Sequence, residues 1–247
     1  MTYCVAMRLD AGLVFLSDSR TNAGVDHINT FRKMHVFEKE GERVLVLMTS
    51  GNLSISQSVV NTLREKLDSS RGSNLNKVKN MFEAAKHIGD CLREIHTRDA
   101  AALESFGVDF ASSIILGGQI KGEEQRVFQI YAAGNFIEAT RDTPYFQIGE
   151  SKYGKPIIDR VISPKTSLDE AAKCALISMD STIRSNLSVD LPLDLVIYER
   201  DGLKIKRHVN ITQDTPYYGD QQTMGRTSAP GIRPVARPGV GNFLNKR

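Results

Sequence analysis

The chain has 247 residues, 40% of them apolar, and a net charge of +3, which is enough to bury the core of one large domain. Its three cysteines are widely spaced and lack nearby histidines, so we expect neither a disulfide framework nor a zinc site. A basic segment followed by an apolar stretch is missing near residue 1, and no run of about 18 apolar residues occurs, so we expect no export, no membrane partner and a cytoplasmic location.

The positive charge is concentrated at the C-terminal end. Residues 220–247 contain five Lys or Arg and one acid, a balance of +4 that leaves −1 for residues 1–219. This basic segment is rich in Gly, Pro, Ser and Thr without a hydrophobic period, which predicts a flexible tail. It contains a single aromatic residue, whereas a nucleic-acid interface would interleave aromatics with its basic residues. We therefore expect a folded domain over residues 2–219 and no nucleic-acid partner.

Two pairs of strands open the predicted fold. Residues 2–9 and 12–20 are rich in β-forming side chains and flank a short turn that contains Gly12, which is typical of a hairpin. Residues 31–41 and 43–51 repeat this pattern around Gly41. The sequence thus predicts four strands before any helix.

The hydrophobic period then changes to that of helices over residues 54–67 and 75–94. Further elements follow in the order strands, helices, strands: strands at 110–120, 126–135 and 136–149, helices at 151–162 and 167–186, and a closing hairpin at 193–202 and 204–210. Separate blocks of strands and helices favour an α+β fold with antiparallel sheets. Two strand sets and two helix pairs predict a four-layer αββα sandwich.

Thr2 stands at the start of the first predicted strand. If an aminopeptidase removes Met1, Thr2 has a free α-amine beside its own hydroxyl. Such an amine has a reference pKa of about 7.7 to 8.0 and can accept the hydroxyl proton near neutral pH. The first hairpin brings Asp18 and Arg20 back toward Thr2, and Lys33 begins the next strand, where its ammonium can pair with Asp18 and lower the pKa of the amine. We therefore expect a Thr2, Asp18 and Lys33 constellation.

The segments TYCVAMRLDAGLVFLSDSRT, FRKMHVFE and LMTSGN resemble the threonine peptidases of the proteasome β-subunit and HslV type. DSRTNAGVD, TFRKM and GNLSISQSV resemble the Anbu (ancestral beta subunit) family in particular, and the similarity spans about residues 2–218. This resemblance implies the fold of the N-terminal nucleophile hydrolases, a catalytic set of Thr2, Asp18 and Lys33, and a ring-like or open helical oligomer. It also implies that a backbone N–H of Ser50 or Gly51 binds the oxyanion.

Other catalytic positions of the proteasome match loosely. Lys33 comes 31 residues after Thr2, one fewer than in the proteasome pattern, and no acid precedes the final strand at the matching place. The resemblance offers Glu150, Ser151, Ser185 and Ser188 for supporting roles, and the first hairpin adds Arg20. These departures leave two functions open.

The first function is an amide-bond hydrolase for peptides or a special amide such as an isopeptide. The second is a ring-forming scaffold or binding protein with the same fold and weak or absent catalysis. Neither needs a metal or a cofactor. The resemblance also raises an unfoldase ATPase as a partner, although no residue pattern in the chain specifies one.

Overall fold

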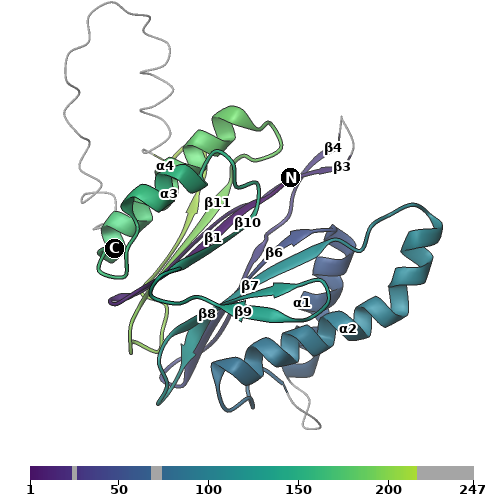
Figure 1. Ribbon diagram of the computed structural model, residues 1–247, viewed down its shortest axis with the longest axis horizontal. Coiled ribbons are helices and arrows are strands. Elements are labelled where there is room, and N and C mark those ends of the chain that lie inside the picture. The colour runs from purple at the N-terminus through teal and green to yellow at the C-terminus, as the bar shows by residue number, and fades with distance from the viewer. Residues whose placement is uncertain (24–26, 68–73, 216–247) are drawn as a thin grey trace, which may run out of the picture.

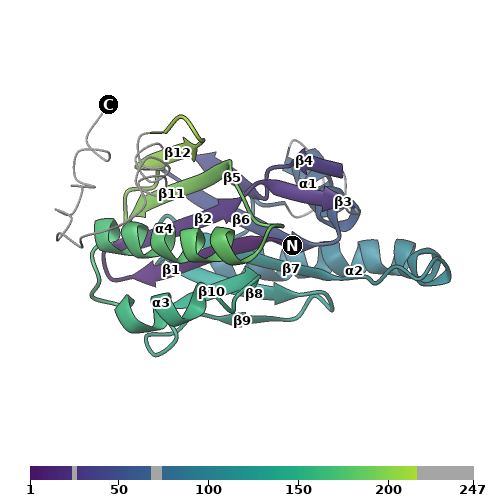
Figure 2. The same cartoon turned by 90° about the horizontal axis from the view of Figure 1, so that it is seen from above.

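The computed structural model describes residues 1–23, 27–67 and 74–215 of the chain. Within these residues, two five-stranded antiparallel sheets lie face to face (Figures 1 and 2). The first sheet has the order β10-β1-β2-β11-β12, with strands Tyr145–Gly149, Tyr3–Leu9, Gly12–Asp18, Leu193–Glu199 and Arg207–Ile211. The second has the order β5-β6-β7-β8-β9, with strands Met34–Lys39, Arg43–Gly51, Ser112–Ile120, Arg126–Tyr131 and Phe136–Glu138.

Helices cover the outer face of each sheet (Figure 1). The helices are α1 and α2 on the second sheet, Leu53–Leu67 and Met81–Ser105, and α3 and α4 on the first, Lys155–Val161 and Leu168–Ser185. The apolar core accordingly has three parts: one under α1 and α2, one between the sheets, and one under α3 and α4. This arrangement confirms the αββα sandwich. None of the helices in the described part of the chain is long and apolar enough to cross a membrane.

The expected hairpins are present, because both the β1–β2 and the β5–β6 pairs are antiparallel neighbours. Both strands of the first hairpin are almost entirely buried, since one face packs on α4 and the other on the second sheet. Residues 136–149 form two strands, β9 and β10, rather than one. A short ribbon of β3 (Arg20–Ala23) and β4 (His27–Thr30) had no clear signal in the sequence.

The second long helix begins later than the hydrophobic period predicts. Asn80 caps α2 by accepting a hydrogen bond from the Glu83 N–H at 2.7 Å, and the helix runs on to Ser105. Leu75 and Val78 are buried but precede the helix, and their carbonyls accept hydrogen bonds from Arg43. The prediction of a helix from residue 75 was therefore wrong, because these apolar side chains reach the core from turns.

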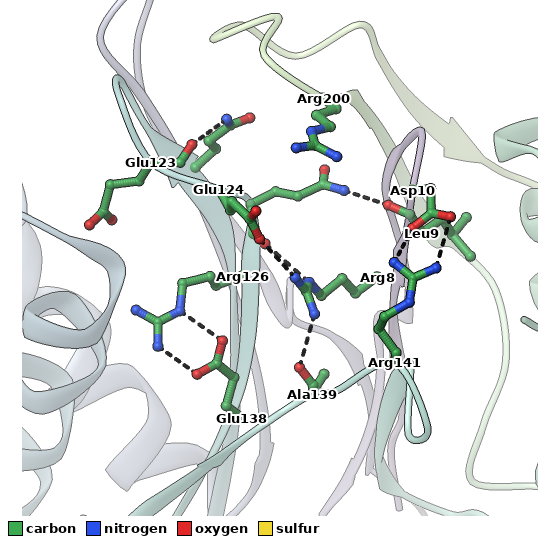
Figure 3. A network of polar contacts seen from close by, with 12 residues as sticks. Arg8, Leu9, Asp10, Glu123, Glu124, Arg126, Glu138, Ala139, Arg141 and Arg200 are labelled. Atoms are coloured by element: carbon green, nitrogen blue, oxygen red, sulfur yellow. Dashed lines mark hydrogen bonds and ion pairs between the residues drawn. The ribbon is translucent and has the colours of Figure 1, made fainter. Parts of the chain in front are cut away.

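Ion pairs tie the loops together at the end of β1 that lies away from Thr2 (Figure 3). Arg8 pairs with Glu124 at 3.3 Å, and Arg141 pairs with Asp10 at 2.9 Å. The Gln125 side-chain amide donates to the carbonyl of Leu9. These contacts join the β1–β2 turn to the loops that follow β7 and β9, so the two sheets are linked at this end by polar groups as well as by the core.

Phe15 and Gly117 generate a packing prediction for the core between the sheets. A Cβ added at Gly117 would lie 2.5 Å from the ring of the fully buried Phe15. Gly117→Ala should therefore destabilise the fold by about 1–3 kcal/mol through overpacking. Urea denaturation of Gly117→Ala, Phe15→Leu and the double variant should show that the second substitution offsets part of the first. Strict additivity of the two free-energy changes would contradict the contact.

Candidate active site

A buried ion pair joins Asp18 to Lys33. Asp18 ends β2, and its fully buried carboxylate accepts one hydrogen bond from the Lys33 ammonium at 2.7 Å and another from the backbone N–H of Tyr3 at 2.9 Å. The Lys33 ammonium also donates to the carbonyl of Arg20 at 2.6 Å. Both oxygens of the carboxylate are thus used, and the pair connects the beginnings of β1 and β5 with the end of β2.

Thr2 is fixed at the beginning of β1 rather than at a loose end. It is only 9% exposed, and its carbonyl accepts a hydrogen bond from the Glu150 N–H at 2.6 Å. Gly149 packs against it with φ of 86°, and a Cβ there would lie 2.0 Å from the Thr2 carbonyl oxygen. Because only glycine fits this approach, the end of β10 holds Thr2 closely.

Burial and charge shift the ionisation of the groups beside Thr2. The pKa of the Met1 α-amine lies below its ordinary value, first because the amine is partly buried and second because the Lys33 ammonium is near. Burial raises the pKa of Asp18 to about 6, although Lys33 and the hydrogen bonds oppose this shift. Above that pH the Asp18 carboxylate is ionised and can hold Lys33 charged.

A cavity of about 1110 Å³ opens beside Thr2. Thr2 and Lys33 line it together with Ser50 and Gly51 from the end of β6. Gly51 has φ of 104°, and its Cβ would lie 2.3 Å from the Ala111 carbonyl oxygen, so this turn also requires glycine. The structure therefore brings the expected nucleophile, ion pair and candidate oxyanion donors to one cavity.

Arg20 contacts the Lys33 ammonium through its backbone and Asp190 through its side chain. Its carbonyl accepts from Lys33, and its guanidinium forms an ion pair with Asp190 at 2.6 Å. Asp190 was missed from the sequence: it lies shortly before β11 and belongs to none of the motifs that the sequence analysis used. Arg20 thus links Lys33 to the segment that precedes β11.

Glu150 has a structural role close to Thr2. It is 7% exposed, and its carboxylate accepts from the Lys152 N–H and from the Asn186 side-chain amide, each at 3.0 Å. Asn186 was also missed; it follows the last residue of α4 and gave no motif signal. Glu150 therefore connects the end of α4 to the backbone beside Thr2.

The three candidate serines lie elsewhere. Ser151 is half-buried and its carbonyl accepts from the Lys155 N–H, while Ser185 is exposed at the end of α4. The Ser188 N–H donates to the Asn186 side chain at 3.0 Å in a turn. In the described part of the chain, none of the three is among the residues that line the Thr2 cavity.

Replacing Lys33 should show how strongly the buried pair depends on its cation. Lys33→Met leaves the Asp18 carboxylate buried without a counter-ion, which should cost about 3–5 kcal/mol of unfolding free energy near pH 7. An acid whose pKa is raised in the folded state stabilises the folded state below its ordinary pKa of 3.8. This contribution to stability is lost as the pH rises through the pKa of the folded state. Lys33→Met raises that pKa further, so its deficit should shrink from pH 7.5 to pH 5.

Urea denaturation of the wild type and the variant at several pH values measures this deficit. Lys39→Met is the matched control, because Lys39 is exposed and pairs with Glu42 at the surface. A deficit for Lys33→Met that is independent of pH, or equal to that of the control, would contradict the assignment.

Comparison with known proteins shows similarity in both sequence and fold. A family model described as "Proteasome subunit" matches residues 2–191. A proteasome subunit beta from Haloquadratum walsbyi is 22% identical over 84% of this chain and 77% of that protein.

Solved structures of Anbu proteins are more similar. Anbu from Yersinia bercovieri is 54% identical with a TM-score of 0.83, covering 94% of this chain and 98% of that one. Anbu from Pseudomonas aeruginosa, solved as a helical assembly, is 46% identical with a TM-score of 0.84, covering 93% and 98%. With this similarity along almost its whole length, the chain belongs to the proteasome family and, within it, to the Anbu (ancestral beta subunit) proteins.

Proposed function

We propose that the protein, once Met1 is removed, hydrolyses amide bonds with Thr2 as its nucleophile. The observation that carries the proposal is the position of Thr2: it lines a large cavity next to a buried Lys33–Asp18 pair, where burial and the Lys33 ammonium together lower the pKa of the Met1 α-amine one residue away. The peptide bond to Met1 would otherwise occupy the nitrogen that must act as the base. Removal of Met1 frees this nitrogen, and the nearby Lys33 ammonium then favours its uncharged form.

The reaction has two steps. The Thr2 hydroxyl oxygen attacks the carbonyl carbon of the amide while its proton moves to the Thr2 amine. The carbon–nitrogen bond then breaks, the leaving amine takes that proton, and an ester remains on Thr2. Water attacks the ester with the same amine as base, which releases the carboxylic acid and restores the hydroxyl.

The other residues position and stabilise these atoms. Lys33 keeps the amine unprotonated by like-charge repulsion, and Asp18 holds Lys33 in place. A backbone N–H of Ser50 or Gly51 donates to the oxyanion, because both residues line the cavity and Gly51 presents no side chain. Arg20 acts through Lys33, and Glu150 acts through the Thr2 backbone.

A scaffold function is the second candidate. It is favoured by the positions of Ser151, Ser185 and Ser188, which do not line the cavity and so cannot supply the supporting hydroxyls expected from a proteasome. A fold can be retained for assembly when its chemistry is lost. In that case Met1 would be retained.

Intact-mass measurement and electrophile labelling distinguish these two functions. We expect the purified protein to lack Met1 and an electrophile specific for N-terminal threonine to label Thr2. Thr2→Ser should keep part of the labelling and turnover because it keeps both hydroxyl and amine, whereas Thr2→Val should lose both by at least about a hundredfold. Retained Met1, or equal turnover by the wild type and Thr2→Val, would exclude the threonine mechanism and support the scaffold.

Self-association is part of the same proposal. Phe82 on α2 and Ile177 on α4 are about half exposed, and Phe106 and Leu187 at the helix ends are more than four-fifths exposed. A second copy of the chain could cover these apolar groups, as in symmetric or helical assemblies. The helical assembly of the Pseudomonas aeruginosa relative supports this expectation.

Light scattering of the full chain at micromolar concentration should therefore give a mass many times that of the 27.4 kDa subunit. A monomer under these conditions would contradict the proposed assembly. The peptide substrate and the unfoldase ATPase partner remain inferences from the family. The cytoplasmic location remains a prediction from the sequence.

We propose a single folded domain over residues 2–219. The tail over residues 220–247 lies outside the described residues, so its proposed flexibility still depends on composition. The proposed hydrolase assigns no role to this tail.

A further inference from the structure

The cavity beside Thr2 is lined by several basic side chains. Arg32 and Lys33 come from the segment that leads into β5, His35 comes from β5 itself, and Arg64 comes from the last turn of α1. No Asp or Glu of the described residues belongs to the lining. An excess of one sign of charge in a concave site attracts ligands of the opposite sign.

Two of these cations have no carboxylate partner among the residues that the structure describes. Lys33 is neutralised by Asp18, whereas no ion pair joins Arg32 or Arg64 to an Asp or Glu in that part of the chain. Other arginines do have such partners, including Arg8, Arg20, Arg43, Arg93, Arg98, Arg126, Arg141 and Arg184. Arg160 and Arg207 also form no ion pair in the described residues, but neither lines the cavity, whereas both arginines of the lining, Arg32 and Arg64, lack a carboxylate partner.

The His35 side chain contacts the Arg64 guanidinium but does not neutralise its positive charge. The Arg64 guanidinium lies 3.3 Å from the His35 Nδ1, and burial together with the charges of Arg64 and Arg32 lowers the pKa of His35 to about 4. A neutral imidazole can accept a hydrogen bond from Arg64 at this nitrogen. The charge of Asp194 opposes this shift; one oxygen of its carboxylate meets His208 and Asn210, and its charge also interacts with that of Arg32. His35 therefore orients Arg64 but does not compensate its charge.

From this arrangement we infer that the cavity selects peptides with an acidic side chain, Asp or Glu, and that Arg64 is the specificity-determining residue. A guanidinium presents paired N–H donors that match a carboxylate. The inference deepens the proposed function, on which it rests for the reaction that follows binding. Binding itself needs no catalysis, so the two can be tested separately.

The test measures binding to the full-length Thr2→Val protein, which cannot turn over the peptide. The probes are fluorescein-labelled Ala-Ala-Glu-Ala-Ala amide, the same peptide with Gln in place of Glu, and the Gln peptide with a free C-terminal carboxylate. Fluorescence anisotropy should show the Glu peptide binding about tenfold more tightly than either Gln peptide at low salt. Added salt should reduce this preference.

Arg64→Met, introduced beside Thr2→Val, should remove most of the preference for Glu. Lys66→Met is the matched control: it removes a cation from the same helix, but Lys66 pairs with Glu94 and is not part of the cavity lining. Thermal unfolding should confirm that both variants remain folded. Arg32→Met provides a second variant if Arg64→Met fails to fold, and it should weaken the preference in the same direction.

Equal binding of the Glu and Gln amides would overturn the inference. So would a preference that survives both Arg64→Met and Arg32→Met, or tight binding of the terminal carboxylate alone. Preferential binding of the Glu peptide without labelling of Thr2 in the wild type would support the inference and reject the proposed hydrolase. Labelling of Thr2 in the wild type without a binding preference for the Glu peptide would support the proposed hydrolase and overturn the inference.

Discussion

The site depends on the buried pair between Asp18 and Lys33. Removing two charges from water costs several kcal/mol for each ion, and the cost is offset only where other hydrogen bonds satisfy the charged groups. Here the Asp18 carboxylate accepts a second hydrogen bond from the Tyr3 N–H, and the Lys33 ammonium donates a second hydrogen bond to the Arg20 carbonyl. Because these partners come from β1, β2 and the segment before β5, the pair can exist only when all three have their native register.

This constraint explains why Thr2 is held tightly at the beginning of β1. A shift of one residue between β1 and β2 would move the Tyr3 N–H away from Asp18 and turn the side chains of β1 to the opposite face. On the other side, β10 pairs Tyr3 with Gly149, and the next residue, Glu150, binds the Thr2 carbonyl. Thr2 is thus fixed by the neighbours of Tyr3 on both sides.

The features that the sequence predicted are those encoded over short distances. The β1–β2 hairpin and the helical periods follow from local patterns, and both are present in the fold. Thr2, Asp18 and Lys33 were identifiable because a hairpin and a known spacing connect them. The late start of α2 was not, because apolar periodicity does not separate Leu75 in a turn from the same residue in a helix.

The contacts that could not be predicted join residues far apart in the chain. Arg20 meets Asp190, Glu150 meets Asn186, and His35 meets Arg64 only after the layers pack. None of these pairs belongs to one element or one motif. The positive lining of the cavity likewise arises from two segments, each of which has ordinary composition when considered alone.

Lys33 and Arg64, two cations near Thr2, have separate roles in the proposed site. On the proposed mechanism, the Thr2 amine must remain unprotonated, and a substrate carboxylate placed nearby would raise the pKa of that amine. Lys33 cannot both bind such a carboxylate and keep repelling a proton, because an additional counter-ion would cancel its field. Its burial against Asp18 keeps it in place, while Arg64, held by neutral His35, is available to the substrate. An acidic substrate can then be bound with less effect on the base, since its charge is balanced by the arginine and not by the lysine.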